Sequence, residues 1–247
     1  MRITRIAATA ALLPGLVLAA FIAPLGAAAQ EATPSMTYRC ETATTASPMA
    51  GMGSMGGMAM GTPAAEGDHD MAGQTVAFDQ LYIDMMIPHH QSIIALAQAA
   101  QDRLSDERLQ AIADTIVGAQ QAEIAELQGY REQWYGSPES MPMDAGMMGM
   151  TTEQMPGMGD MDMMAMQMDP DALVSAFCAG EDPDLTFIEL TIPHHEMAIM
   201  ASEAALERAT HDEIREVAER VVADQQREID ELRAIRQELT GEATPAA

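Results

Sequence analysis

Apolar residues recur at three- and four-residue spacing from Phe78 to Leu104, and this spacing predicts an amphipathic helix. The apolar stripe keeps its phase through Pro88, so the pattern indicates one kinked helix rather than two separate helices. A break follows at Ser105, after which a second stripe from Leu109 to Trp134 predicts a returning helix. We therefore expect residues 75–135 to form a helical hairpin.

The same pattern occurs again further along the chain. Sliding the sequence by 105 residues aligns residues 79–134 with residues 184–239 without a gap, and one Ile-Pro-His-His falls on another. A register kept over this length indicates a duplicated unit, which makes residues 182–240 a second hairpin. At its start, Asp182-Pro183 is typical of a helix N-cap and first turn, and Thr210 with Glu213 has the spacing of a capping box.

Each hairpin alone would leave an apolar face exposed to water. Packed together, the two hairpins predict an all-α fold, a four-helix bundle of roughly 115 residues, which is large enough for one stable core. The alternative is that each hairpin pairs with a hairpin of another chain.

Two tracts outside the hairpins are rich in methionine. The N-terminal segment, residues 30–74, contains "PMAGMGSMGGMAM" at 48–60, and residues 141–168 of the linker 136–181 contain twelve methionines. Neither tract has the apolar periodicity that would bury it, so we expect both to be disordered, like the tail 241–247. Within the linker, residues 169–179 are expected to form a short helix.

Residues 1–29 have the composition of a secretory signal peptide. Arg2 and Arg5 precede an apolar run that ends in Ala27-Ala28-Ala29, a small-residue cleavage site. An uncleaved membrane anchor is the alternative. Cleavage would remove two arginines and no acidic residue, and the formal charge would change from −26 to −28. So acidic a protein repels nucleic acid and anionic membranes, and we expect neither as a partner.

The chain has two cysteines, Cys40 and Cys178, and an exported protein meets oxidising conditions. They are a candidate disulfide or, alternatively, thiolate metal ligands. Both lie outside the predicted hairpins, so the sequence does not give their separation.

Polar residues interrupt the apolar stripes. At 100° per residue, His89 lies in the middle of its stripe and His90 lies on the flank. On the returning helix, Gln120 and Glu123 occupy positions in phase with the apolar residues. The second copy repeats this with His194, His195, Gln225 and Glu228.

Distances from the turn indicate that these residues share one layer. His89 is 16 residues before Ser105 and Gln120 is 15 residues after it, so an antiparallel hairpin places them at the same height. Glu123 is then expected near Met85 and Met86. Such a layer is either a binding site for a metal or another ligand, or a purely structural set of polar contacts that fixes helix register.

Imidazole and thioether groups favour Cu(I) or Ag(I), and imidazole also suits Cu(II). Met197 and Met200 follow His194 on one helical face, and Met86 precedes His90 by four residues. The candidate metal ligands are His89, His90, His194, His195, Met85, Met86, Met197 and Met200. Gln120, Glu123, Gln225 and Glu228 are candidate supporting residues or further ligands. His211 is interpreted as an ordinary residue at a helix start.

Catalytic signatures are missing from the sequence. A ferritin-like di-iron centre needs two Glu-x-x-His pairs and two further glutamates, whereas this chain has Gln-x-x-Glu opposite His-His. No Ser-His-Asp pattern, phosphate loop or dinucleotide fingerprint occurs. We therefore expect a binding protein rather than an enzyme, with a redox metalloenzyme as a weaker hypothesis.

The segments "DMMIPHHQSIIALA" and "LTIPHHEMAIMAS", followed by "QQAEIAEL" and "QQREIDEL", resemble the domain of unknown function 305 family. The resemblance covers about 57 residues of each copy. It implies a ferritin-like bundle and an exported protein that binds copper and supports copper resistance, with the four motif histidines, Met197 and Met200 at the functional positions. The first copy departs from the pattern, with Ser92 and Ala95 where the second has methionine.

The leading hypothesis is an extracytoplasmic protein that sequesters, stores or carries Cu(I), and also Cu(II), with the methionine tracts capturing or relaying ions. The alternative is a structural or interaction module of the cell envelope. A homo-oligomer or a copper-handling partner protein is compatible with either.

Overall fold

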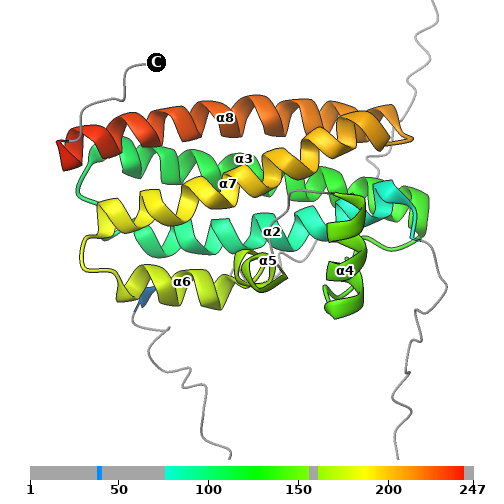
Figure 1. Cartoon of the computed structure of the whole chain (residues 1–247), viewed down its shortest axis with the longest axis horizontal. Coiled ribbons are helices and arrows are strands. Elements are labelled where there is room, and N and C mark those ends of the chain that lie inside the picture. The colour runs from blue at the N-terminus through cyan, green and yellow to red at the C-terminus, as the bar shows by residue number, and fades with distance from the viewer. Residues whose placement is uncertain (1–37, 41–75, 156–160, 242–247) are drawn as a thin grey trace, which may run out of the picture. The chain divides into compact units, whose positions relative to one another are not determined.

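The computed structural model describes residues 38–40, 76–155 and 161–241, and its regular secondary structure in these ranges is entirely helical (Figure 1). The long helices are α2 (Phe78–Ala100), α3 (Glu107–Tyr135), α7 (Pro183–Arg208) and α8 (Asp212–Thr240). Three short helices lie between the hairpins: α4 (Ala145–Gln154), α5 (Met161–Gln167) and α6 (Pro170–Ala179). The predicted all-α fold is confirmed.

The long helices pack as the duplicated pattern predicts. Helix α2 packs against α3, α7 packs against α8, and the two hairpins meet mainly through α2 and α7 (Figure 1). Helices α2 and α7 run without interruption through Pro88 and Pro193, which confirms one helix rather than two at each position. Asp182 caps α7 as expected, because its carboxylate accepts a hydrogen bond from the Leu185 N–H at 3.1 Å.

Two apolar clusters lie on either side of the histidines. Along α2, the residues up to Ile87 belong to the first cluster and those from Ile93 onward to the second. Along α7 the order is mostly reversed, with Ile192 in the second cluster and Met197 in the first, although Ile199 also belongs to the second. The His-His pairs therefore lie between two blocks of apolar side chains that exclude water from them.

The methionine-rich linker corrects one prediction. Residues 141–155 and 161–168 are not disordered, because they include helices α4 and α5, which pack against α2. The side chains of Met147, Met155, Met164 and Met168 are buried in the first apolar cluster. Methionine is unbranched and flexible, so it fits an irregular surface without a regular apolar period. The tract at 48–60 and residues 242–247 of the tail lie outside the described residues, and α6 matches the short helix expected at 169–179.

Each hairpin caps the other through a buried aspartate. Asp184, in the first turn of α7, accepts hydrogen bonds from the N–H groups of Ser105 and Asp106 at 2.7 and 3.2 Å, just before α3. Asp79, in the first turn of α2, accepts them from the N–H groups of Thr210 and His211, both at 2.9 Å, just before α8. These contacts satisfy N–H groups at helix starts and join the two repeats.

The predicted capping box at Thr210 is wrong. The Thr210 hydroxyl donates to Asp79 at 2.6 Å, and α8 begins at Asp212 after His211. His211 is also more than an ordinary helix-start residue, because its ring lies 2.5 Å from Asp79 and stacks on Trp134 with ring centroids 3.7 Å apart. Although burial raises the pKa of Asp79, the hydrogen bonds from Thr210 and His211 outweigh burial and lower it.

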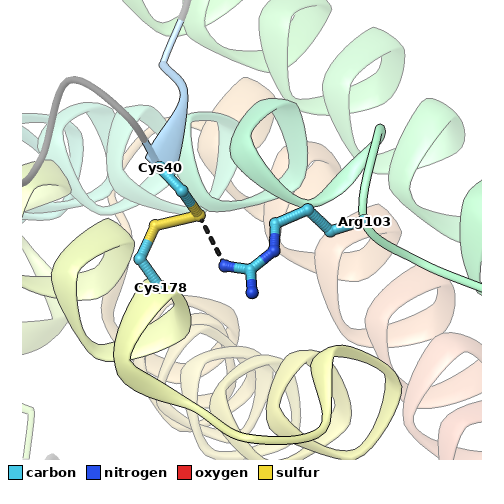
Figure 2. Close-up of a disulfide and its surroundings, with 3 residues drawn as sticks. All are labelled: Cys40, Arg103 and Cys178. Carbon is cyan, nitrogen blue, oxygen red and sulfur yellow. Dashed lines mark hydrogen bonds between the residues drawn. A yellow bond between two sulfur atoms is a disulfide. The ribbon is translucent and has the colours of Figure 1, made fainter.

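Cys40 and Cys178 form a disulfide with 5.3 Å between their Cα atoms, which excludes their use as thiolate ligands in this state (Figure 2). Figure 2 also shows the Arg103 guanidinium donating to the Cys40 sulfur at 2.9 Å. Tyr38 and Cys40 pack against the second apolar cluster. The disulfide thus fastens the segment before the hairpins to the end of α6.

In the described ranges, no helix has both the length and the apolar character needed to span a membrane. The predicted signal peptide at residues 1–29 lies outside those ranges.

Candidate metal centre

All four motif histidines are completely buried. His89, His90, His194 and His195 each have 0% of their surface exposed. The sequence predicts the second histidine of each pair on the flank of its apolar stripe, and in the structure this flank is buried as well. Helices α3 and α8 cover this flank, so the periodicity of a single helix does not show that it is buried.

A glutamate binds the second histidine of each pair. His90 Nε2 lies 2.8 Å from Glu123 Oε2, and His195 Nε2 lies 2.7 Å from Glu228 Oε2. Glu123 was expected near Met85 and Met86, one turn away. Side chains tilt toward the N-terminus of their own helix, so in an antiparallel pair the glutamate and histidine lean toward each other and meet. A carboxylate only accepts hydrogen bonds, so each Nε2 carries the proton.

Ser92 contacts His194 across the two repeats. Its hydroxyl lies 2.9 Å from His194 Nε2, 2.7 Å from the His89 carbonyl oxygen and 2.5 Å from the Gln167 carbonyl oxygen. The single hydroxyl hydrogen goes to one of the carbonyl oxygens, which cannot donate. His194 Nε2 therefore donates to Ser92. The sequence signalled Ser92 only as the position where the first copy lacks the methionine of the second.

Several other ring nitrogens have no hydrogen-bond partner of good geometry in the described ranges. They are Nδ1 of His90, His194 and His195, and both nitrogens of His89, and all of them are buried. Because Nε2 carries the proton in three of the rings, the unpaired Nδ1 atoms of these rings carry a lone pair whenever the imidazole is neutral. An unsatisfied buried polar atom costs about 1–3 kcal/mol, and several occur here in one layer. Such atoms fit a ligand that accepts electron pairs.

The first histidines of the two pairs meet at the centre of the layer. The rings of His89 and His194 have centroids 3.7 Å apart and planes 32° apart. Burial lowers the pKa of both well below the ordinary histidine value, and the charge that neighbouring histidines would carry lowers it further. Both rings are therefore neutral near pH 7, which is the form that binds metals.

The predicted glutamines and one threonine complete the layer. Gln120 and Gln225 are each 3% exposed, and the side-chain oxygen of each has no hydrogen-bond donor among the described residues. The hydroxyl of Thr191 is buried without a partner in the same way. Thr191 occupies the position of Met86 in the other repeat and was not predicted from sequence.

The candidate methionines differ in position. Met85, Met86 and Met197 are buried in the first apolar cluster, next to the histidine layer along α2 and α7. Met200 is only half-buried and lines a separate surface pocket with Glu153 and Glu203. Met86 and Met197 are within one helical turn of a histidine, whereas Met200 is farther from the layer.

The described residues contain no group of three or more His, Cys, Asp or Glu side chains arranged to hold a metal ion. The donors that the layer offers are imidazoles, with the thioethers of Met86 and Met197 within one helical turn of them. Cu(I) and Ag(I) suit such soft donors, whereas Zn²⁺ usually takes four ligands and Ca²⁺ six or more oxygens. The residues present fit a soft monovalent ion.

A family model, "Domain of unknown function (DUF305)", matches residues 23–131 and 79–236 of the chain. No curated protein matches this chain. Among solved structures, CopM in the Cu(II)-bound form is 27% identical, with a TM-score of 0.50, over 65% of this chain and 97% of that one.

Two further structures share the fold. CopM in the Cu(I)-bound form is 24% identical, with a TM-score of 0.51, over 67% of this chain and 99% of that one. A DUF305 protein from Streptomyces coelicolor is 22% identical, with a TM-score of 0.52, over 69% and 97% of the two chains.

Proposed function

The chain belongs to the DUF305 family, and from this premise we propose that it is an exported protein that binds copper, chiefly as Cu(I), in the buried histidine layer. The observation that carries the proposal is the set of unpaired ring nitrogens on His89, His90, His194 and His195. Copper is the cargo of the protein. The similar protein CopM, which has Cu(I)-bound and Cu(II)-bound forms, supports this choice of metal.

Each glutamate fixes the tautomer of the second histidine of a pair. A carboxylate that accepts the Nε2–H of a histidine fixes its tautomer and makes its other nitrogen a better electron donor. Glu123 and Glu228 have this relation to His90 and His195, and Ser92 fixes the tautomer of His194. The ring nitrogens are thus held ready before the ion arrives.

We propose binding without catalysis. The histidines have 0% exposure, so an organic substrate has no direct contact with an ion bound between them. Sequestration, storage or carriage in metal homeostasis fits such a site. Export is supported by the Cys40–Cys178 disulfide, since disulfides persist mainly in oxidising compartments.

Replacing all four histidines with alanine tests the proposal. We expect the variant His89→Ala/His90→Ala/His194→Ala/His195→Ala to bind at least one Cu(I) fewer than the wild type when titrated against a chromophoric Cu(I) chelator. Circular dichroism checks that the variant is folded, and a milder variant, His89→Gln/His194→Gln, should show the same loss. The control is His211→Ala, which lies outside the layer and should keep full stoichiometry.

Unchanged stoichiometry in both layer variants would contradict the proposal. The layer would then be a structural set of polar contacts, and copper would bind elsewhere in the protein. If the proposal holds, Cu(I) at 100 times its Kd should stabilise the wild type by about 2.7 kcal/mol.

Glu123→Gln/Glu228→Gln should lower Cu(I) affinity about 10–100-fold without changing stoichiometry, because loss of an outer carboxylate typically weakens a metal site by that factor. Competition against the same chelator measures the change. Glu126→Gln/Glu231→Gln, on the same helices three residues further along, is the matched control and should keep wild-type affinity. Equal affinities for the two double variants would show that the carboxylates only hold the helices together.

A further inference from the structure

Methionine side chains also line a pocket outside the histidine layer. A cavity of about 700 Å³ lies between α2, residues 139–143, α4 and the junction of α5 and α6. Its lining includes four methionines, Met141, Met143, Met148 and Met168, together with Ser140. Helices α4 and α5 can be seen beside α2 in Figure 1.

The lining offers several soft donors to one space. Met141, Met143 and Met148 are half-buried, so they touch the first apolar cluster and still reach the pocket. The Ser140 hydroxyl is buried and has no hydrogen-bond partner within the part of the chain that the structure describes. Thioethers are uncharged at any pH and bind Cu(I) and Ag(I) in preference to hard ions.

A buried ion pair holds the pocket wall in place. Asp84 is 0% and Arg131 5% exposed, and Arg131 Nε donates to Asp84 Oδ1 at 2.5 Å. The pair also binds the wall: Arg131 Nη1 donates to the Ser137 carbonyl oxygen at 2.7 Å, and the Met141 N–H donates to Asp84 at 3.2 Å. The backbone that carries the first two pocket methionines is thus fixed to α2 and α3.

The duplication shows that this ion pair serves the linker. The equivalent residues of the second repeat are Glu189 and Arg236, of which Glu189 is exposed and Arg236 half-buried. Only the first hairpin is followed by the methionine-rich linker. A buried charge pair at this one copy is therefore explained by the segment that it anchors.

The pocket adjoins the histidine layer through α2. Pro88 and Gln91, which line the pocket, directly flank His89 and His90 in the sequence. One turn of α2 therefore supplies both lining residues of the pocket and two histidines of the layer. Glu139, also in the lining, adds a negative charge that attracts cations.

We propose that this pocket is a thioether site for a soft monovalent cation, Cu(I) or Ag(I), separate from the histidine layer. This site is inferred from the pocket lining and the hydrogen bonds that hold residues 137–141. A transfer of copper from this site to the histidine layer would rest on the proposed function. Its ligands are Met141, Met143 and Met148, with Met168 and the Ser140 hydroxyl as further donors.

The test is a titration of the mature full-length protein with Ag(I), with the methionine methyl groups labelled with ¹³C and followed by NMR. The variant Met141→Leu/Met143→Leu/Met148→Leu keeps side-chain volume and removes three thioethers. The three methyl signals that are missing from the spectrum of this variant are those of the pocket methionines. We expect these signals to shift in the wild type, and the variant to bind one Ag(I) fewer. Met168 is left intact because it is buried in the core.

The matched control is Met150→Leu/Met163→Leu/Met166→Leu, three linker methionines that do not line the pocket. It should keep wild-type stoichiometry. Equal losses in the two triple variants would overturn the proposal, because any exposed thioether would then serve. Pocket signals that stay in place while others shift would also overturn it.

The two sites fail independently. In the variant that lacks the four layer histidines, the pocket signals should still shift with Ag(I). If only the histidine variant binds less metal than the wild type, the pocket is not a metal site. If only the pocket methionine variant binds less, the histidine layer is not a metal site.

Discussion

Replacing Arg131 with leucine should lower the free energy of unfolding by about 3–5 kcal/mol, because it leaves the carboxylate of Asp84 buried without a counter-charge. The variant also loses the hydrogen bond to the Ser137 carbonyl oxygen, so residues 137–141 should detach from α2. For a chain of this size the melting temperature should fall on the order of 10 °C. Urea denaturation followed by circular dichroism measures the change.

The internal repeat supplies the control. Arg236→Leu changes the equivalent residue of the second hairpin, which is half-buried, and should cost about 1 kcal/mol or less. The double variant Asp84→Leu/Arg131→Leu removes both charges and should recover part of the loss, since apolar replacement of a whole buried ion pair is often neutral. A cost for Arg131→Leu no larger than that for Arg236→Leu would refute the role of the pair.

Removing the disulfide, in Cys40→Ala/Cys178→Ala, should destabilise the protein by about 2–5 kcal/mol. The bond closes a loop of 138 residues, and a cross-link over so long a loop strongly restricts the unfolded chain. The variant also frees Tyr38 and residue 40 from the second apolar cluster, which adds a smaller loss of packing. Thermal unfolding without reductant measures the effect.

Reduction provides an independent check on that prediction. A phosphine reductant should lower the melting temperature of the wild type to that of the double alanine variant and leave the variant unaffected. Equal melting temperatures for oxidised wild type and variant would show that the cross-link contributes nothing to stability. Copper binding by the histidine layer should survive in the variant, because the disulfide joins residue 40 to α6, whereas the layer histidines lie on α2 and α7.

The histidine layer was largely predictable from the sequence. The phase of His89 within an apolar stripe, its repetition at His194, and the heights of Gln120 and Glu123 all follow from helix geometry and a single turn. Burial of the second histidines and their glutamate contacts was not predictable, because one helical wheel has no information about which neighbouring helix covers its flank.

The roles of Ser92 and of the buried ion pair of Asp84 and Arg131 could not be predicted from the sequence. Ser92 looked like a missing methionine in the first motif, yet its hydroxyl binds His194 of the other repeat and the Gln167 carbonyl oxygen of the linker. The ion pair joins residues 47 positions apart on two helices, where each residue alone has an ordinary helical context. Contacts of this kind depend on how helices are rotated against each other.

The sequence by itself determined the helices, their duplication and the family of the chain, because a regular period and a repeated register are local properties that every copy carries. Only the tertiary structure decided that the linker methionines fold, that Cys40 reaches Cys178 and which ring nitrogens stay unpaired. These features depend on surfaces supplied by distant parts of the chain. A methionine-rich segment without a period of its own folds when the bundle offers it an apolar face, and a histidine becomes a candidate ligand when its neighbours take the proton of one nitrogen and leave the other free.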